Sequence, residues 1–190
     1  AANAQFIYEH NNEIGIYLDP NPTAVNAQEL SNYDGLPGQV AAYVVLTNPY
    51  NNNLNAPITV VGGFEFRIVL PANVFLLAAT LPPNSTNFAT APDFLCGSNA
   101  PVVDNHVTLL TLNLGAFDGA TSLLYLTPVQ DAPQSVPGEL AITDFNDDFS
   151  ISVAYPVSGD PALPVFGLFT GGAVVPTEDA SWGEVKSLFR

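Results

Sequence analysis

The sequence is poor in basic residues: 3 of its 190 residues are Lys or Arg, against 18 Asp or Glu, for a formal net charge of −15. Charged residues make up 11% of the chain, whereas about 25% is usual in soluble domains, so the negative charge reflects missing bases. Nucleic-acid binders need a basic surface, and anionic lipids attract clusters of Lys and Arg. The composition therefore excludes nucleic acid as a partner and argues against electrostatic docking on membranes.

Sulfur-containing residues and long apolar runs are also scarce. Methionine is absent and Cys96 is the single cysteine, so no internal disulfide can form; its apolar context predicts a buried, unreactive thiol. No uncharged apolar run approaches the ~20 residues of a membrane helix, so we expect no membrane span. The small residues that open the chain, Ala1-Ala2-Asn3-Ala4, are typical of the stub left by signal-peptide cleavage, although a start chosen by design would look the same. We therefore expect a secreted protein, extracellular or at the cell surface.

What remains is a sequence of short β-rich runs. Hydrophobic residues make up 47% of the chain and aromatic residues 11%, which excludes intrinsic disorder, and 17 prolines with 14 glycines exclude long helices from the body. Strand patterns occupy residues 14–18, 39–46, 63–70, 74–81, 106–114, 121–127, 139–143, 149–155 and 165–169. The sequence therefore predicts an all-β fold, an antiparallel β-sandwich of about nine strands of the jelly-roll kind, with a short C-terminal helix.

Alternation along the strands predicts which residues face the core. In residues 63–70 the pattern places Phe64, Phe66 and Ile68 on one face and Glu65 and Arg67 on the other. In residues 149–155 it favours an inward face of large residues and an outward face of serines; the inward set is Phe149, Ile151, Val153 and Tyr155, and the outward set is Ser150 and Ser152. We divide the chain into an N-terminal segment (1–13), a β-sandwich domain (14–175) and a helical tail (176–190).

The tail carries the features of an amphipathic helix. Trp182, Val185 and Phe189 are spaced three and four apart and form one apolar face, and Lys186 and Arg190 lie in the last turn. So short a helix cannot stand alone in water, so it must pack on its own domain or on a neighbouring copy. We predict that these five residues make the assembly contact and that the receiving surface is acidic.

The run 144–148 is a candidate calcium loop. Asp144, Asn146 and Asp148 stand at alternate positions and supply the oxygen ligands that calcium prefers. Phe149 and Tyr155 occupy the positions of the EF-hand glycine and glutamate, so the loop is not an EF-hand. A polar β-turn explains the same residues. Calcium is therefore a candidate ligand, and no other cofactor is indicated.

Catalytic patterns are missing, and two tyrosines are the candidate ligand contacts. His10 and His106 are far apart in the sequence and have no recognisable nucleophile spacing, so we expect no enzyme. Tyr33 and Tyr50 lie in two long segments predicted as loops, residues 19–37 and 48–57, where an exposed ring can stack on a sugar. Most other tyrosines lie in strand patterns, which favours packing roles.

One passage of the sequence resembles a known family. Residues 43–48 (YVVLTN) are followed by residues 61–71 (VGGFEFRIVLP) and Val74, a pattern similar to that of cohesin-type and related carbohydrate-module sandwiches. The resemblance covers roughly residues 40–127 and implies a nine-strand, secreted, calcium-tolerant module used for attachment. The chain departs from the pattern after residue 127 and lacks a dockerin or substrate signature, so no binding residue is carried over. Residues 181–190 are similar to the ends of small uncharacterised secreted proteins of uncultivated bacteria, which assigns no role.

These observations favour a non-enzymatic structural subunit that assembles with its own copies into an extracellular filament, sheath or surface layer. Sparse charge suits a chain that spends its life in an assembly, because a free monomer needs a well-charged surface to stay soluble. The alternative is a cohesin-like or carbohydrate-binding attachment module, whose partner is a glycan or another surface protein.

Overall fold

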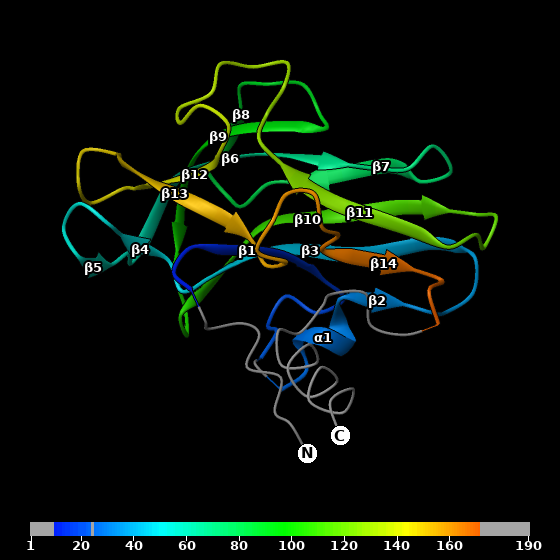
Figure 1. The fold of residues 1–190 in the computed structure, drawn as a ribbon. Coiled ribbons are helices and arrows are strands. Elements are labelled where there is room, and N and C mark those ends of the chain that lie inside the picture. Colours follow the sequence, from blue (N-terminus) through cyan, green and yellow to red (C-terminus); the bar gives the residue numbers. More distant parts are fainter. Residues whose placement is uncertain (1–9, 24, 172–190) are drawn as a thin grey trace, which may run out of the picture.

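Strands are the main secondary structure of the computed structural model, which describes residues 10–23 and 25–171 (Figure 1). Fourteen strands and one short helix lie in this part of the chain: β1 (Glu13–Tyr17), α1 (Ala27–Leu30), β2 (Asn32–Tyr33), β3 (Gly38–Thr47), β4 (Tyr50–Asn51), β5 (Ala56–Pro57), β6 (Val60–Val69), β7 (Phe75–Thr80), β8 (Thr86–Asn87), β9 (Asp93–Pro101), β10 (His106–Ala116), β11 (Ser122–Thr127), β12 (Leu140–Asp144), β13 (Ser150–Pro156) and β14 (Phe166–Leu168). The predicted all-β sandwich is confirmed, and each of the nine predicted runs is a strand. The predicted C-terminal helix, with its five assembly residues, and residues 1–9 of the N-terminal segment lie outside the described residues.

The strands form two facing layers joined through β13. In the back layer β7, β10, β3 and β1 pair in that order, all antiparallel. In the front layer β6 is central and pairs with β9, β12 and β11, and β8 pairs with the far edge of β9. β13 pairs antiparallel with β12 and parallel with β1, so it connects the two layers.

The core lies between the layers and confirms the face predicted for β6. Phe64, Phe66 and Ile68 are at most 2% exposed and pack with leucines of β10 such as Leu112. Phe66 stacks between Phe64 and Phe94, with ring centroids 5.6 Å apart in each pair. Burial of such apolar side chains supplies most of the free energy that stabilises a sandwich.

The buried outer face of β3 is explained by the segment that crosses it. Val45 points away from the main core and packs with Tyr17 and Ala27 in a second, smaller cluster. Ala27 belongs to α1, so the segment of residues 19–37 that was predicted as a loop contains a helical turn that covers this part of the back layer. The other predicted loop, residues 48–57, contains the short hairpin of β4 and β5.

The predicted orientation of β13 is wrong, because its serine face is the inner one. Ser152 is 3% exposed and lies opposite Ile142 of the core, and Ala154 lies opposite buried Leu140. The large side chains point outward instead: Phe149 is 50% exposed and Ile151 and Tyr155 are each 43% exposed, with Val153 half-buried. Small residues are needed on the inner face because β13 lies at the junction of both layers, and the Ser152 hydroxyl accepts a hydrogen bond from the backbone N–H of Asn52 (3.2 Å).

Candidate functional site

A shallow apolar groove crosses the outer face of the front layer. Its floor consists of small residues, because Gly63 of β6 lies opposite Gly97 of β9 on one side and Thr143 of β12 on the other. A Cβ atom at Gly63 would lie 2.6 Å from the carbonyl oxygen of Cys96 and 3.0 Å from Oγ1 of Thr143, so no larger residue fits there. The cavity above the floor has a volume of about 350 Å³. We call it the outer groove, which is lined chiefly by Phe88, Phe149, Gly63, Gly97, Ala141 and Thr143.

Two phenylalanine rings form the walls of the outer groove. Phe88 follows β8 and is 72% exposed, and Phe149 precedes β13. A Cβ atom at Gly97 would meet the Phe88 ring at 3.3 Å, and one at Gly62 would meet the Phe149 ring at 2.8 Å, so both rings lie against glycine backbone. Phe145 packs edge to face on Phe149, with centroids 5.4 Å apart. Exposed aromatic clusters of this kind mark contact surfaces.

The floor and one side of the groove hold polar groups in fixed positions. Oγ1 of Thr143 is buried in the floor, where it has no hydrogen-bond partner among the described residues. Glu65 is 2% exposed, and both of its carboxylate oxygens accept the backbone N–H of Ser135 at 3.1 and 3.0 Å. This contact fastens the connection between β11 and β12 beside the groove.

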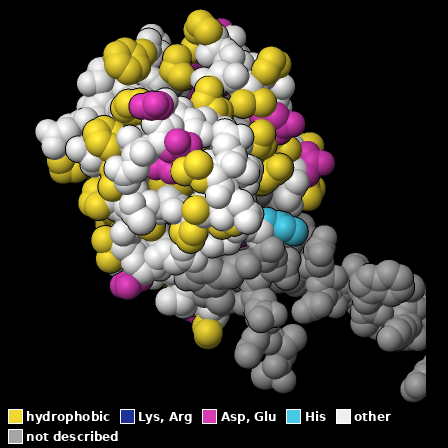
Figure 2. Space-filling model, turned by 90° about the vertical axis from the view of Figure 1, so that its left-hand side faces the viewer, with side chains coloured by type: hydrophobic (Ala, Val, Ile, Leu, Met, Phe, Trp, Pro, Cys, Tyr) yellow, Lys and Arg dark blue, Asp and Glu magenta, His cyan; other side chains and the backbone are white. Residues whose placement is uncertain are grey.

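The surroundings of the outer groove are acidic. Arg67 is the sole Lys or Arg in the part of the chain that the structure describes, and its Nη1 atom donates to Asp93 and Asp131, each at 3.1 Å. The hydrogen bond with Asp131 is the main reason that the pKa of Arg67 is raised. Asp148 and Glu139, beside Phe149 and β12 in the sequence, are exposed. Figure 2 shows the adjoining end of the molecule, where hydrophobic side chains lie among uncharged and acidic ones.

The predicted calcium loop is closed by an amide. Nδ2 of Asn51 donates to Oδ2 of Asp144 (3.0 Å) and to Oδ2 of Asp147 (2.9 Å), and Oδ1 of Asp144 accepts the backbone N–H of Asn146 (3.0 Å). Asp148 is exposed, with a positive φ of 45°. No group of three or more His, Cys, Asp or Glu side chains that could hold a metal lies among the described residues. Calcium binding through Asp144, Asn146 and Asp148 stays a prediction.

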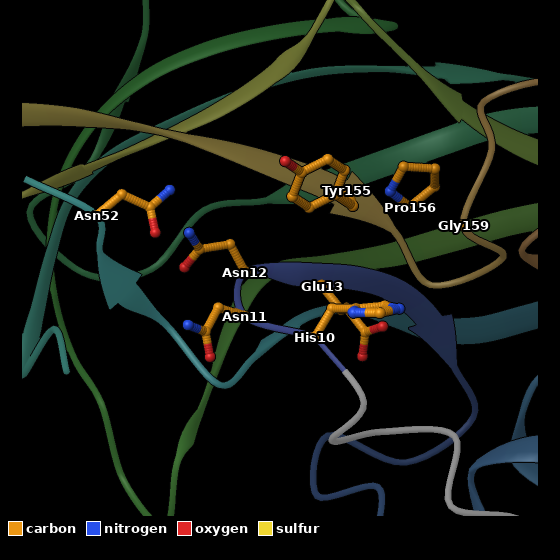
Figure 3. Close-up of a pocket in the computed structure, with 8 residues that line it drawn as sticks. All are labelled: His10, Asn11, Asn12, Glu13, Asn52, Tyr155, Pro156 and Gly159. Carbon is orange, nitrogen blue, oxygen red and sulfur yellow. The ribbon is translucent and has the colours of Figure 1, made fainter. Parts of the chain in front are cut away.

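A polar cavity of about 490 Å³ lies where β13 meets the start of β1 (Figure 3). His10 and Glu13 line this cavity together with Tyr155 and Pro156, and Figure 3 labels all four. Asn12 lies at its edge, but its amide is occupied: Nδ2 donates to the carbonyl oxygens of Tyr50 (3.0 Å) and Val153 (3.1 Å), and Oδ1 accepts the N–H of Tyr50 (2.6 Å). Asn12 therefore acts as a structural clamp between β1, β4 and β13.

The two tyrosines predicted as ligand contacts lie apart. Tyr33 is in β2, where its hydroxyl donates to the carbonyl oxygen of Leu36 (3.0 Å) and its ring packs edge to face on Phe169. Tyr50 is in β4, and its hydroxyl donates to Oδ1 of Asn55 (2.8 Å). Neither lines the outer groove or the polar cavity. Their role in ligand binding stays a prediction.

Cys96 is buried, as predicted, on the core side of β9. Burial raises the pKa of its thiol to about 12, so the thiolate form is scarce at neutral pH. No other cysteine is present in the sequence. Burial and the raised pKa both disfavour reaction of this thiol in the folded protein.

Sequence reasoning missed the outer groove, although two signals point to it. Paired glycines at Gly62 and Gly63 inside an otherwise bulky strand indicate close approach of a neighbouring group. Phe145 and Phe149, which flank a polar turn, are placed where burial in a core is difficult. Together these residues indicate an apolar surface beside a glycine-rich floor.

Comparisons with known proteins give a likeness in structure but none in sequence family. No protein-family model matches the sequence, and no curated protein matches it. A type II cohesin domain from the cellulosome of Acetivibrio cellulolyticus is similar in structure, with a TM-score of 0.39 and 13% sequence identity over 90% of this chain and 97% of that chain. No helix among the described residues has the length and apolar character needed to span a membrane.

Proposed function

We propose that this chain is a non-enzymatic structural subunit that assembles with its own copies outside the cell into a filament, sheath or surface layer. In the proposed contact, the outer groove of one copy receives residues 181–190 of the next. The observation that carries this proposal is the groove itself, in which exposed phenylalanine walls stand over a glycine floor.

The apolar part of residues 181–190 matches the groove in kind. If the segment is helical, Trp182, Val185 and Phe189 share one face, and their side chains supply the bulk that the small residues of the floor leave room for. Phe88 and Phe149 would pack on either side of them.

Charge supports the same pairing. The sequence has three Lys or Arg residues. One of them, Arg67, is already paired with two aspartates, and the other two, Lys186 and Arg190, both belong to the proposed contact segment. Asp148 and Glu139 beside the groove are exposed acids without an ion pair among the described residues. Opposite charges at the rim of an interface raise the association rate and fix the register.

A binding assay tests this contact directly. A fluorescent peptide of residues 177–190 is titrated with protein that lacks residues 181–190, and anisotropy is measured. We expect saturable binding that weakens at least tenfold when Phe149→Ser is introduced, and that weakens as salt is raised because the rim charges are screened.

Two controls sharpen the result. The peptide with Lys186→Glu and Arg190→Glu keeps the apolar face but reverses both charges, and it should bind more weakly. The protein variant Thr111→Ser changes an exposed residue of the back layer and should bind as the parent does. Binding that ignores Phe149→Ser, or a peptide that binds nowhere while deletion of residues 181–190 lowers the melting temperature of a monomer, would contradict docking between copies.

The second candidate function is an attachment module that binds a glycan or another surface protein. The polar cavity favours it, because the exposed ring of Tyr155 lines it together with His10 and Glu13, and such a ring beside polar groups suits a sugar. A glycan array with the intact chain, repeated with Tyr155→Ala, Tyr33→Ala and Tyr50→Ala, tests it. Signal lost with Tyr155→Ala would favour this function over self-assembly.

A further inference from the structure

Strand β7 leaves one edge of the back layer open. In the part of the chain that the structure describes, β7 pairs with β10 alone and stands at the end of the strand order. It is six residues long, about 20 Å of strand, whereas the other strands at sheet ends, β2 and β8, have two residues each. About half of its residues direct a backbone N–H and C=O toward the open side. Such an edge can pair with another strand.

The edge lacks two of the devices that usually prevent pairing, which are charged side chains and a proline inside the strand. No charged residue occurs between Arg67 and Asp93, so β7, β8 and the turns beside them are uncharged. No proline lies inside β7; Pro71 and Pro82 flank it and limit pairing to the strand itself. Each copy carries a net charge of −15, so two copies repel least where they present uncharged segments to each other.

A patch of exposed apolar side chains lies beside this edge on the outer face of the back layer. Phe75 is 54% exposed, Leu77 is 45% exposed and Phe117 is 56% exposed. A Cβ atom at Gly115 of β10 would lie 2.6 Å from the Phe117 ring and 3.3 Å from Leu77, so the two side chains meet over that glycine. A strand added at β7 would extend this surface and cover part of it.

A bulge in β7 sets which of its residues share a face. Phe75, Ala78 and Thr80 lie opposite outer-face residues of β10, and the register shifts at Leu77, which also lies on the outer face because it covers Gly115. Leu76 and Ala79 lie opposite Leu114 and Leu112 and pack on the core. The strand therefore has large residues in its first half (Phe75, Leu76, Leu77) and small ones in its second half (Ala78, Ala79, Thr80).

We infer that β7 pairs antiparallel with β7 of a second copy about a two-fold axis between Leu77 and Ala78. In this register Phe75 lies opposite Thr80 of the second copy, Leu76 opposite Ala79, and Leu77 opposite Ala78. Each large residue meets a small one, and because of the bulge each pair lies on a single face of the joined sheet. The two back layers then form one continuous sheet through β10 and β7. This contact is separate from the outer groove and does not depend on residues 181–190.

Sedimentation velocity on protein that lacks residues 181–190 tests the inference without the proposed groove contact. We expect a monomer–dimer equilibrium that tightens as salt is raised, because screening weakens the repulsion between two copies of net charge −15. Binding at the groove should show the opposite salt dependence. Amide hydrogen exchange in β7 of the same protein, without any further substitution, should slow as protein concentration rises.

Substitutions at the axis test the register. Ala78→Leu places leucine opposite Leu77 of the second copy, so the dimer should weaken at least tenfold, and adding Leu77→Ala should restore it because large again meets small. Ala78→Lys should abolish the dimer, whereas Ala41→Lys, the same change at an exposed position of β3 beyond β10, should leave it intact.

Three results would overturn the inference. The first is a monomer at all concentrations, with β7 amides that exchange at a rate independent of concentration. The second is a dimer that survives Ala78→Lys. The third is a dimer that is lost on deletion of residues 1–9, which would identify that segment as the strand that β7 accepts.

Discussion

Asn51 makes the sharpest stability prediction, because one small side chain holds two carboxylates together. The residue is fully buried in β4. Its Nδ2 atom donates to Asp144 and Asp147 at 3.0 and 2.9 Å, and its Oδ1 atom accepts the backbone N–H groups of Asn53 and Leu54 at 3.0 and 3.1 Å. Asn51→Ala removes all four hydrogen bonds and leaves the two carboxylates facing a gap.

The four hydrogen bonds of the Asn51 side chain do not contribute equally to the free energy of unfolding. Asp144 is 5% exposed, and loss of a hydrogen bond to a buried charged acceptor costs about 1.5–3 kcal/mol. Asp147 is half-buried, so water replaces part of its lost donor, and the N–H groups of Asn53 and Leu54 belong to exposed residues that water can reach. We therefore expect the free energy of unfolding to fall by about 3 kcal/mol, which lowers the melting temperature of a domain of this size by about 6–12 °C.

Urea denaturation and calorimetry measure this effect, with Asn52→Ala as the matched control. Asn52 is the next residue, is exposed, and makes no side-chain hydrogen bond within the described residues, so its replacement should change the free energy of unfolding by less than about 0.5 kcal/mol. If Asn51→Ala costs no more than Asn52→Ala, the amide does not hold the loop and the reasoning is refuted.

Further predictions concern Asp93, Cys96 and the 144–148 loop. Asp93 is fully buried and accepts hydrogen bonds from Arg67 and from two backbone N–H groups. Asp93→Ala should therefore lower the free energy of unfolding by about 3 kcal/mol, measured by urea denaturation. Because burial raises the pKa of Cys96, the thiol loses its proton at a lower pH in the unfolded chain than in the folded one. The free energy of unfolding should therefore be unaffected below pH 9 and fall from pH 9 toward pH 12. Cys96→Ala should remove that fall in melting experiments at alkaline pH. The same thiol should resist iodoacetamide until urea unfolds the protein. A chelator should leave the melting temperature unchanged if the Asn51 amide alone closes the 144–148 loop, whereas a clear fall would favour calcium there and Asp148→Asn should then reproduce it.

Strand positions could be predicted from the sequence because alternation and turn residues are local signals. The Asp118-Gly119 turn between β10 and β11 is an example: the Asp118 carboxylate accepts the N–H of Ala120, which lowers the pKa of Asp118, and Gly119 adopts a positive φ of 66°. β9 was missed because Gly97-Ser98-Asn99 reads as a turn. In the structure Gly97 lies inside the strand, where it allows close approach to Gly63.

The face of β13 could not be predicted, because alternation indicates two faces but not which one is buried. The partners decide it: Ile142 and Leu140 of β12 pair with Ser152 and Ala154, so the small residues turn inward. The outer groove depends on the same reversal, since an inward Phe149 would leave no wall. The candidate site is therefore a property of strand pairing that local pattern could not reveal.

Arg67 has one more consequence. Trypsin cuts after Lys and Arg, and within the described residues this side chain marks the single possible cleavage point. The bond lies inside β6, paired with β9 and β11, and the guanidinium is held by two aspartates, so a protease cannot reach it while the strand is in place. Cleavage after residue 67 can occur only in molecules whose front layer has opened. The rate at which the 1–67 fragment forms therefore reports the rate at which the sandwich opens. Mass spectrometry measures it without any label.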